Sequence, residues 1–175
     1  MKTTFFALVL FIAVISSCKN SDTPDPGRNL DPGDATVTVT ANGNETDYTG
    51  TAVYVGKDNF IDNTSRHKFD INLDGTDEKI ILNIIYDNNT TDGEIETGEH
   101  ECGRLTPNNS AQFDGRVAEF YFINSDVYKW VDNAGTVNVT KAESPEFTVS
   151  FDVSIINDVT GNFDRIGGSF VSKER

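Results

Sequence analysis

The segment from Phe147 to Ile155 reads FTVSFDVSI, and this segment decides the fold. Large apolar side chains occupy every second position, and Thr, Ser and Asp occupy the positions between them. Successive side chains of a β-strand point to opposite faces, so the alternation gives this strand one apolar face and one polar face. A strand buried on one face only is typical of an antiparallel sheet, because parallel strands are usually covered on both faces.

The same period of two recurs along the chain, and no segment carries the 3.6-residue period of an amphipathic helix. We therefore expect a single all-β domain over residues 35–175, built as an antiparallel β-sandwich of about ten strands. A closed, lipocalin-like β-barrel is the alternative, because both architectures need the same alternation. The other alternating segments are residues 36–40, 51–55, 69–73, 117–123 and 137–139.

Turn-forming residues between the apolar runs predict three hairpins. Asp74-Gly75 separates residues 69–73 from 79–86, and residues 132–135 separate a strand at 128–131 from one at 136–140. Residues 157–161 should return the long strand towards Phe163. An open sheet needs edge strands that discourage pairing with another chain, and the acid-rich segment from Glu94 to Glu101 and the Gly-rich stretch at residues 161–168 are the two candidates.

The first residues have the pattern of an export signal. Lys2 precedes eleven consecutive apolar residues, Phe5 to Ile15. A membrane-spanning helix needs about 20 apolar residues, whereas the apolar part of a secretory signal needs about 7 to 15. The segment Ile15-Ser-Ser-Cys18 that follows resembles the lipobox of bacterial lipoproteins, in which the cysteine is lipidated and becomes the new N-terminus. The resemblance implies a signal peptide at residues 1–17 and acyl chains on Cys18 that anchor the protein to a membrane.

Residues 18–34 are expected to form the lipidated cysteine and a flexible tether. The stretch from Lys19 to Asp34 reads KNSDTPDPGRNLDPGD, which holds three prolines and has no apolar period. Such a composition cannot bury enough surface to fold, so the domain should be held away from the membrane. Acidic residues soon after the lipidated cysteine also resemble signals that send Bacteroidota lipoproteins to the cell surface. We expect an outer-membrane lipoprotein, with exposure at the cell surface implied by this second resemblance.

The lipobox and the tether combine with several later segments in a pattern similar to small β-rich Bacteroidota lipoproteins of unknown function. The resemblance implies a fold and a compartment, and it implies no catalytic residues. Asn162 stands where that group usually has Thr, and His100 stands where it usually has an aromatic residue. The segments that carry the resemblance are Thr97 to His100, GTVNVTK at residues 135–141, Gly161-Asn-Phe163 and Gly168-Ser-Phe170.

Charge excludes one class of partner. The chain has 28 acidic and 14 basic residues, for a formal net charge of -14. Nucleic-acid binding needs clustered Lys and Arg that displace phosphate counterions, and the sequence has no basic cluster. The same acidity opposes adhesion to an anionic lipid surface, so the membrane partner must be reached through the lipid anchor.

Two segments contain residues of the types that bind metal ions in proteins. The segment Asp70-Ile-Asn72-Leu-Asp74-Gly75 matches the first half of an EF-hand loop, but Ile81 stands where the loop needs a bidentate Glu. Weak calcium binding by Asp70, Asn72 and Asp74 and a simple solvated hairpin both remain open. His100 and Cys102 would share one face of a strand, and they form either part of a metal site or a buried, inert pair.

The last candidate site is aromatic. Tyr128 and Trp130 are expected on one face of a short strand, where they either stack on a sugar ring or pack in the core. The sequence has neither a G-x-S-x-G nor an H-E-x-x-H motif. We therefore expect a non-enzymatic domain without a cofactor other than the covalent lipid, which binds a glycan or a protein partner. A carrier of a small apolar ligand, with a cavity inside a closed barrel, is the alternative.

Overall fold

The computed structural model describes residues 30–61, 63–106, 115–124, 127–129, 135–156 and 161–175. Strands make up nearly all of the regular structure in these residues, together with one turn of helix, and no helix among them has the length and apolar character to cross a membrane. The strands are β1 (Asp34–Ala41), β2 (Asn44–Asn59), β3 (Thr64–Leu73), β4 (Lys79–Asp87), β5 (Gly98–Glu101), β6 (Arg116–Asn124), β7 (Val127–Lys129), β8 (Gly135–Glu143), β9 (Glu146–Ile156), β10 (Phe163–Val171) and β11 (Lys173–Glu174), and the helix is α1 (Asn88–Thr91).

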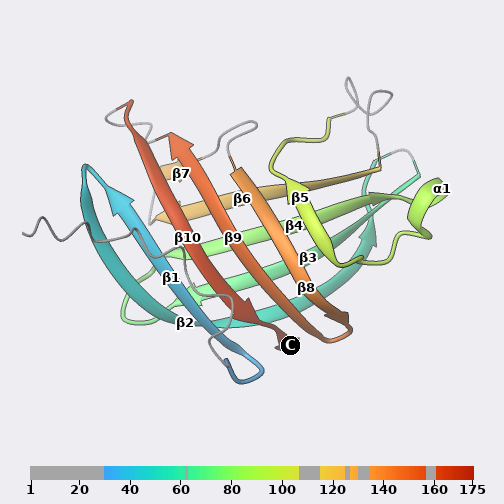
Figure 1. Cartoon of the computed structure of the whole chain (residues 1–175), viewed down its shortest axis with the longest axis horizontal. Helices are drawn as coiled ribbons and strands as arrows, with labels where there is room; N and C mark the ends of the chain where they lie inside the picture. The colour runs from blue at the N-terminus through green and yellow to red at the C-terminus, as the bar shows by residue number, and fades with distance from the viewer. Residues whose placement is uncertain (1–29, 62, 107–114, 125–126, 130–134, 157–160) are drawn as a thin grey trace, which may run out of the picture.

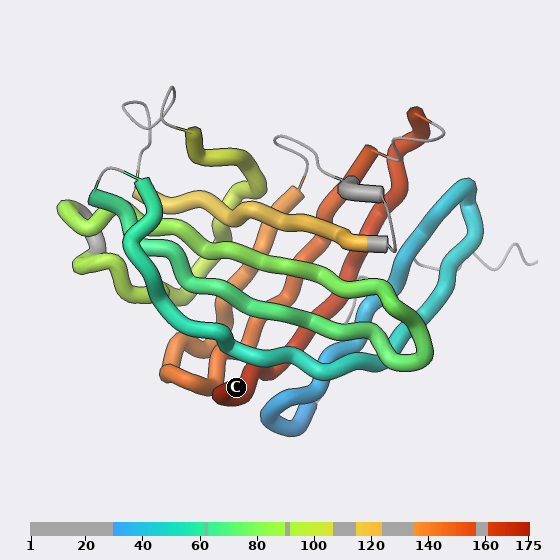
Figure 2. The backbone as a smooth tube through the Cα atoms, turned by 180° about the vertical axis from the view of Figure 1, so that it is seen from behind, coloured from blue at the N-terminus to red at the C-terminus, as the bar shows by residue number. Residues whose placement is uncertain are grey.

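All of these strands belong to one sheet, with the order β5-β8-β9-β10-β1-β2-β3-β4-β6-β7 and with β11 paired in parallel to β2. The half that contains β8, β9, β10 and β1 faces the half that contains β3, β4 and β6, and the strands of the two halves cross (Figures 1 and 2). The long strand β2 curves from one half into the other. Its pairing with β3 is irregular between Tyr54 and Gly56, and such a bulge increases the bend and twist of a strand.

The two ends of the sheet meet near Cys102. Cys102 forms an isolated parallel bridge with Ala118 of β6, and Gly103 N donates to Ala118 O at 2.9 Å. The sheet is therefore nearly closed into a barrel. The all-β, antiparallel prediction is confirmed, and the continuous sheet corresponds to its barrel alternative.

Two of the predicted hairpins are confirmed and one is wrong. In the first, β3 pairs with β4 across the turn at Asp74-Gly75, and in the second β9 pairs with β10. The hairpin predicted around residues 132–135 does not form, because β7 pairs with β6 whereas β8 pairs with β5 and β9. Strands that follow each other in sequence are not always neighbours in a sheet, and periodicity fixes the face of a strand but not its partner. The acidic strand β5 lies at one end of the strand order, as expected for an edge. The other candidate edge is wrong, because residues 163–168 belong to β10, which pairs with β9 on one side and β1 on the other.

The core lies between the two facing halves. Every second residue of β9 is buried from Phe147 to Ile155, as the alternation predicts. The Phe69 ring packs against those of Phe147 and Phe170, with 5.5 Å between ring centres in each case. Burial of a large apolar side chain contributes about 1.5 to 3 kcal/mol, so these rings supply much of the stability of the fold. A Cβ atom on Gly168 would lie 2.7 Å from the Phe151 ring, so this close packing requires glycine.

Candidate functional site

The segment from Asp92 to Thr97 joins α1 to β5 and packs at the end of the sheet beside α1 (Figure 1). Ile95 in this segment is 8 % exposed and belongs to the main apolar core. Gly93 has a φ angle of +68°, which is left-handed, and a Cβ atom there would overlap Asn88 Oδ1 and lie 2.5 Å from Ser65 Oγ. Only glycine fits this position, because both the backbone conformation and the surroundings exclude a side chain.

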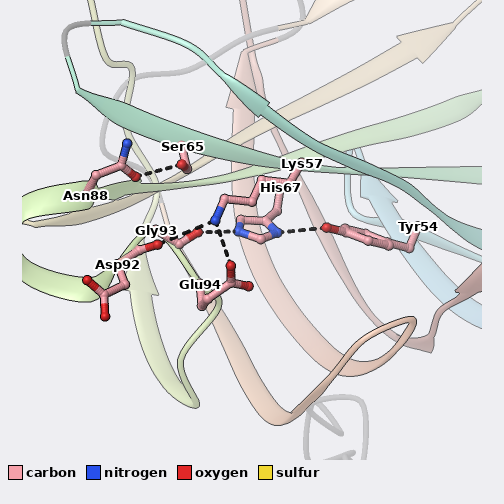
Figure 3. Close-up of polar contacts among 8 residues, drawn as sticks. All are labelled: Tyr54, Lys57, Ser65, His67, Asn88, Asp92, Gly93 and Glu94. Carbon is pink, nitrogen blue, oxygen red and sulfur yellow. Dashed lines mark hydrogen bonds and ion pairs between the residues drawn. The ribbon is translucent and has the colours of Figure 1, made fainter.

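His67 fixes the segment from inside the barrel. Its Nε2 lies 2.7 Å from the carbonyl oxygen of Gly93, and its Nδ1 lies 2.9 Å from the hydroxyl of Tyr54 on β2 (Figure 3). A carbonyl oxygen only accepts, so Nε2 carries the proton and Nδ1 accepts from Tyr54. Burial lowers the pKa of His67, although the Gly93 carbonyl and Glu94 partly oppose this effect. The geometry and the pKa direction agree on a neutral imidazole with both nitrogens bonded.

His100 on β5 repeats the arrangement. Its Nδ1 donates to the carbonyl oxygen of Gly98 at 3.0 Å, and its Nε2 therefore accepts from the Tyr86 hydroxyl in a short hydrogen bond. The same hydroxyl accepts from the backbone N of Glu96 at 2.9 Å. Burial lowers the pKa of His100, and the positive charge of Arg116 adds to this effect. Burial raises the pKa of Tyr86 to about 12, so its hydroxyl keeps its proton.

The four rings form a row across β2, β3, β4 and β5. Ring centres are 6.1 Å apart for Tyr54 and His67, 6.3 Å apart for His67 and Tyr86, and 5.5 Å apart for Tyr86 and His100. Every ring nitrogen in the row already has a hydrogen-bond partner, so neither histidine has a nitrogen available as an acid or base. The row therefore acts as a structural clamp between the barrel wall and the segment from Asp92 to Thr97, which we call the closing segment.

Cys102 has no nucleophilic role in this environment. Its side chain is 3 % exposed and faces the core, on the same side of the chain as His100. Burial raises the pKa of the Cys102 thiol to about 12. A thiol reacts through its thiolate, so Cys102 is inert in the folded protein at neutral pH.

A polar layer covers the outside of the clamp. Lys57 Nζ lies 2.7 Å from Glu94 Oε1 and 3.5 Å from the carbonyl oxygen of Asp92. Ser65 Oγ donates to Asn88 Oδ1 at 2.6 Å, which links β3 to the first residue of α1 (Figure 3). These contacts connect the barrel strands to both sides of Gly93.

A half-open pocket of about 270 Å³ adjoins this polar layer. Within the loop that joins β2 to β3, Phe60 N donates to Thr64 O at 3.1 Å and Thr64 N donates to Ile61 O at 2.9 Å. Asn88 N donates to Asn63 O at 3.0 Å, which ties the loop to α1. The pocket is lined by Asn59, Phe60, Ile61, Asn63, Thr64 and Asn88.

The predicted calcium ligands lie where the alternation places them. Ile71 and Leu73 are buried, whereas Asp70, Asn72 and Asp74 lie on the outer face and in the adjoining turn. Asp74 Oδ2 accepts from Thr49 Oγ1 at 2.8 Å. No group of three or more His, Cys, Asp or Glu side chains in the described part of the chain is arranged to hold a metal ion. Calcium binding at this hairpin stays a prediction.

The other predicted site residues are only partly described. Tyr128 lies in β7, which pairs with β6, but its side chain is not described. Trp130 and Cys18 lie outside the described residues. The predicted aromatic face and the lipid anchor therefore stay predictions.

Sequence reasoning missed both the clamp and the pocket. His67 stands at an inward position of β3, two residues before Phe69, and a polar residue within an apolar alternation is the signal that could have identified it. The pocket gave no comparable signal, because Asn88 joins the loop at residues 59–64 only through the fold. The chain matches no family model, no curated protein and no solved structure, so the site rests on this geometry.

Proposed function

We propose that this protein is an exported outer-membrane lipoprotein, anchored through acyl chains on Cys18, whose barrel is a non-enzymatic module that binds a glycan or a protein partner. One observation carries the proposal. The side chains best suited to chemistry, His67, His100 and Cys102, are all committed to buried structural contacts, while a half-open pocket adjoins Asn88 in the polar layer outside the clamp. Such a barrel end is suited to recognition rather than to catalysis.

The alternative of an apolar carrier has less support. A carrier needs an empty space among its inward-facing side chains. In this barrel the rings of Tyr54 and Phe147 are 4.9 Å apart, and those of Phe120 and Phe151 are 5.2 Å apart. These contacts join rings from opposite halves of the sheet and occupy the space that a carried ligand would need.

The anchor is tested on its own. Cys18→Ala should move the full-length protein from the membrane fraction to the soluble fraction, and Cys102→Ala is the matched control that should stay in the membrane. Protease added to intact cells should cleave the anchored protein if the tether presents it at the surface. Retention of Cys18→Ala in the membrane would overturn the lipid anchor.

The binding role is tested with the full chain in detergent micelles. A glycan array should retain the protein on one class of glycan, with heat-denatured protein as the control. A saturable protein partner, identified by cross-linking on intact cells and reconstituted from purified components, is the other expected form of binding. Turnover of any retained glycan, seen as a new product by mass spectrometry, would contradict the non-enzymatic role.

A further inference from the structure

We propose that Asn42 is a site of spontaneous deamidation, where its carboxamide becomes a carboxylate through a cyclic imide formed with the backbone N of Gly43. The modification does not depend on the proposed function. The turn between β1 and β2 holds the one Asn-Gly pair in the chain. A glycine after the asparagine leaves the attacking nitrogen open, because glycine has no side chain to shield it.

The turn between β1 and β2 is two residues long. The strands pair as far as Ala41 and Asn44, and the φ angles of Asn42 and Gly43 are 53° and 77°. Two left-handed residues in a two-residue loop form a type I′ turn, for which Asn-Gly is a preferred sequence. The N–H of the second loop residue lies outside the strand ladder, and Gly43 N donates no hydrogen bond among the described residues. The attacking atom therefore has no partner to give up.

The reacting atoms are also open to water. Asn42 and Gly43 are exposed, and a Cβ atom built on Gly43 would meet nothing within 4 Å beyond its chain neighbours. A Cβ atom on Gly93, which follows an aspartate, would overlap neighbouring side chains, so that pair is enclosed. Gly75 is as open as Gly43, but it follows Asp74, whose negative charge opposes attack on the carboxylate carbon. Access and chemistry combine only at Asn42.

A neighbouring amide activates the carboxamide of Asn42. Asn162 Nδ2 donates to Asn42 Oδ1 at 3.1 Å, from the residue directly before β10. The turn between β1 and β2 lies beside the start of β10 in both views (Figures 1 and 2). Attack on an amide carbon moves negative charge onto the amide oxygen, and a donor already aimed at that oxygen stabilises the transition state. Asn162 should therefore speed the reaction.

The reaction needs no reactant other than water. Gly43 N loses its proton to solvent and bonds to Asn42 Cγ, the Cγ–Nδ2 bond breaks, and Nδ2 leaves as ammonia with a proton from water. A water molecule then adds to one carbonyl carbon of the imide and cleaves the bond from that carbon to Gly43 N. Cleavage at Cγ gives aspartate, and cleavage at the backbone carbonyl carbon gives isoaspartate. Water is consumed, ammonia is released, and no atom is oxidised or reduced.

Either product changes the tip of the hairpin. Aspartate at position 42 adds a negative charge and still accepts from Asn162, in a charge-assisted hydrogen bond that is stronger than the neutral one. Isoaspartate carries the chain through Cβ and Cγ, which lengthens the backbone of a two-residue turn by one carbon. The pairing of Ala41 with Asn44 should then loosen. Older copies of the protein should therefore differ from new ones in charge and in turn geometry.

The test incubates the full-length protein in detergent micelles at pH 8.0 and 37 °C, in water enriched in oxygen-18. Peptide mapping by mass spectrometry should show loss of the carboxamide at residue 42 before the exposed Asn44 and Asn72 lose theirs. The product should carry one heavy oxygen, and isoaspartate should form together with aspartate. If residue 42 keeps its carboxamide as long as Asn44 and Asn72 do, the site is wrong. If aspartate forms alone, the cyclic imide is wrong.

Variants separate the reacting residue from its activating neighbour. Asn42→Asp has no carboxamide at position 42, so the fast release of ammonia should disappear. Asn162→Ala removes the donor to Asn42 Oδ1 and should slow the loss at residue 42 about twofold to tenfold, which is the usual worth of one hydrogen bond. Asn72→Ala is the matched control, and it should react at the rate of the parent.

Circular dichroism melting curves check that each variant is folded. Ammonia release from Asn42→Asp at the rate of the parent would overturn the site. Loss of the carboxamide from Asn162→Ala at the rate of the parent, or faster, would overturn the activating role of Asn162.

Discussion

The Nε2 atom of His67 lies 2.7 Å from the carbonyl oxygen of Gly93 and joins the barrel wall to the segment that packs against its end. Both partners are strictly constrained. His67 is neutral, with its Nδ1 accepting from Tyr54, and Gly93 must be glycine to bring its carbonyl this close. The contacts of His100 with Tyr86 and Gly98 form a matching clamp on β5.

A fall in pH should begin to destabilise the protein at pH values well above those at which carboxylates titrate. The pKa values of His67 and His100 are lowered from 6.5 in the folded state, so the unfolded chain binds protons first as the pH falls. The stability that the neutral histidines contribute is therefore fully present above about pH 6.5, the unfolded pKa, and is lost progressively below it. Urea unfolding should give a smaller free energy of unfolding at pH 5.0 than at pH 7.5. A free energy that is constant or rises over this range would contradict the assignment.

The variant His67→Gln should weaken that pH dependence. Gln can still donate to Gly93 but does not titrate, so about half of the loss between pH 7.5 and pH 5.0 should disappear. The double variant His67→Gln with His100→Gln should remove most of it. Replacement of an exposed residue such as Asn72 with Ala should leave the pH dependence of the parent unchanged.

Gly93→Ala should cost more stability than Gly75→Ala. Both glycines have a left-handed backbone, with φ angles of +68° and +73°. A Cβ atom at Gly75 meets open space, so that substitution carries only the backbone strain, about 1 kcal/mol. A Cβ atom at Gly93 would also displace Ser65 and Asn88, and the total should exceed about 2 kcal/mol. If chemical denaturation showed that Gly93→Ala and Gly75→Ala lower the free energy of unfolding equally, the closing segment would not be packed as described.

Tyr86→Phe should be destabilising by about 1 to 3 kcal/mol. The change removes the hydroxyl that bonds His100 Nε2 and Glu96 N, and the buried His100 Nε2 and the partly buried Glu96 N both lose this partner. Tyr48→Phe is the control, because Tyr48 is half-buried on β2 and its hydroxyl makes no hydrogen bond among the described residues. A difference of less than about 0.5 kcal/mol between the two variants would contradict the role of the Tyr86 hydroxyl.

Counting thiols tests Cys102 and the lipid anchor together. Burial and a pKa of about 12 should keep Cys102 unreactive towards a maleimide at pH 7, and unfolding in urea should make it react. The chain has two cysteines, and a lipidated Cys18 would hold its sulfur as a thioether. The mature protein purified from its membrane should therefore give one reactive thiol after unfolding. Two thiols would contradict lipidation, and rapid labelling before unfolding would contradict the burial of Cys102.

The sequence predicts the faces of the strands well because burial imposes a period of two. The alternation at Phe147 to Ile155 gave the correct inward set, and Asp74-Gly75 gave a correct hairpin because a tight turn is a local event. Pairing between distant strands leaves no such local pattern. The meeting of Cys102 with Ala118, which nearly closes the sheet, depends on the curvature of β2 and could not be predicted.

The candidate site was harder to predict for the same reason. His67, Tyr54 and Gly93 come from three separate segments, and each has a common structural role when it is considered alone. The sequence placed His100 beside Cys102, as part of either a metal site or a buried, inert pair, and gave no sign of its real partner Tyr86, which lies on another strand. Polar clusters of this kind arise from the register of neighbouring strands, which a single sequence does not specify.

The most direct test of the account is the protonation state of the two histidines, because the proposed non-enzymatic role depends on their being structural. The chain has only two histidines, so 15N NMR of histidine-labelled protein gives one pair of ring signals for each. At pH 7 we expect both rings to be neutral, with the proton on Nε2 of His67 and on Nδ1 of His100, and both pKa values to lie below 6.5. A ring that titrates at or above pH 6.5, or that exchanges between tautomers, would have a nitrogen free for acid–base chemistry and would contradict the account.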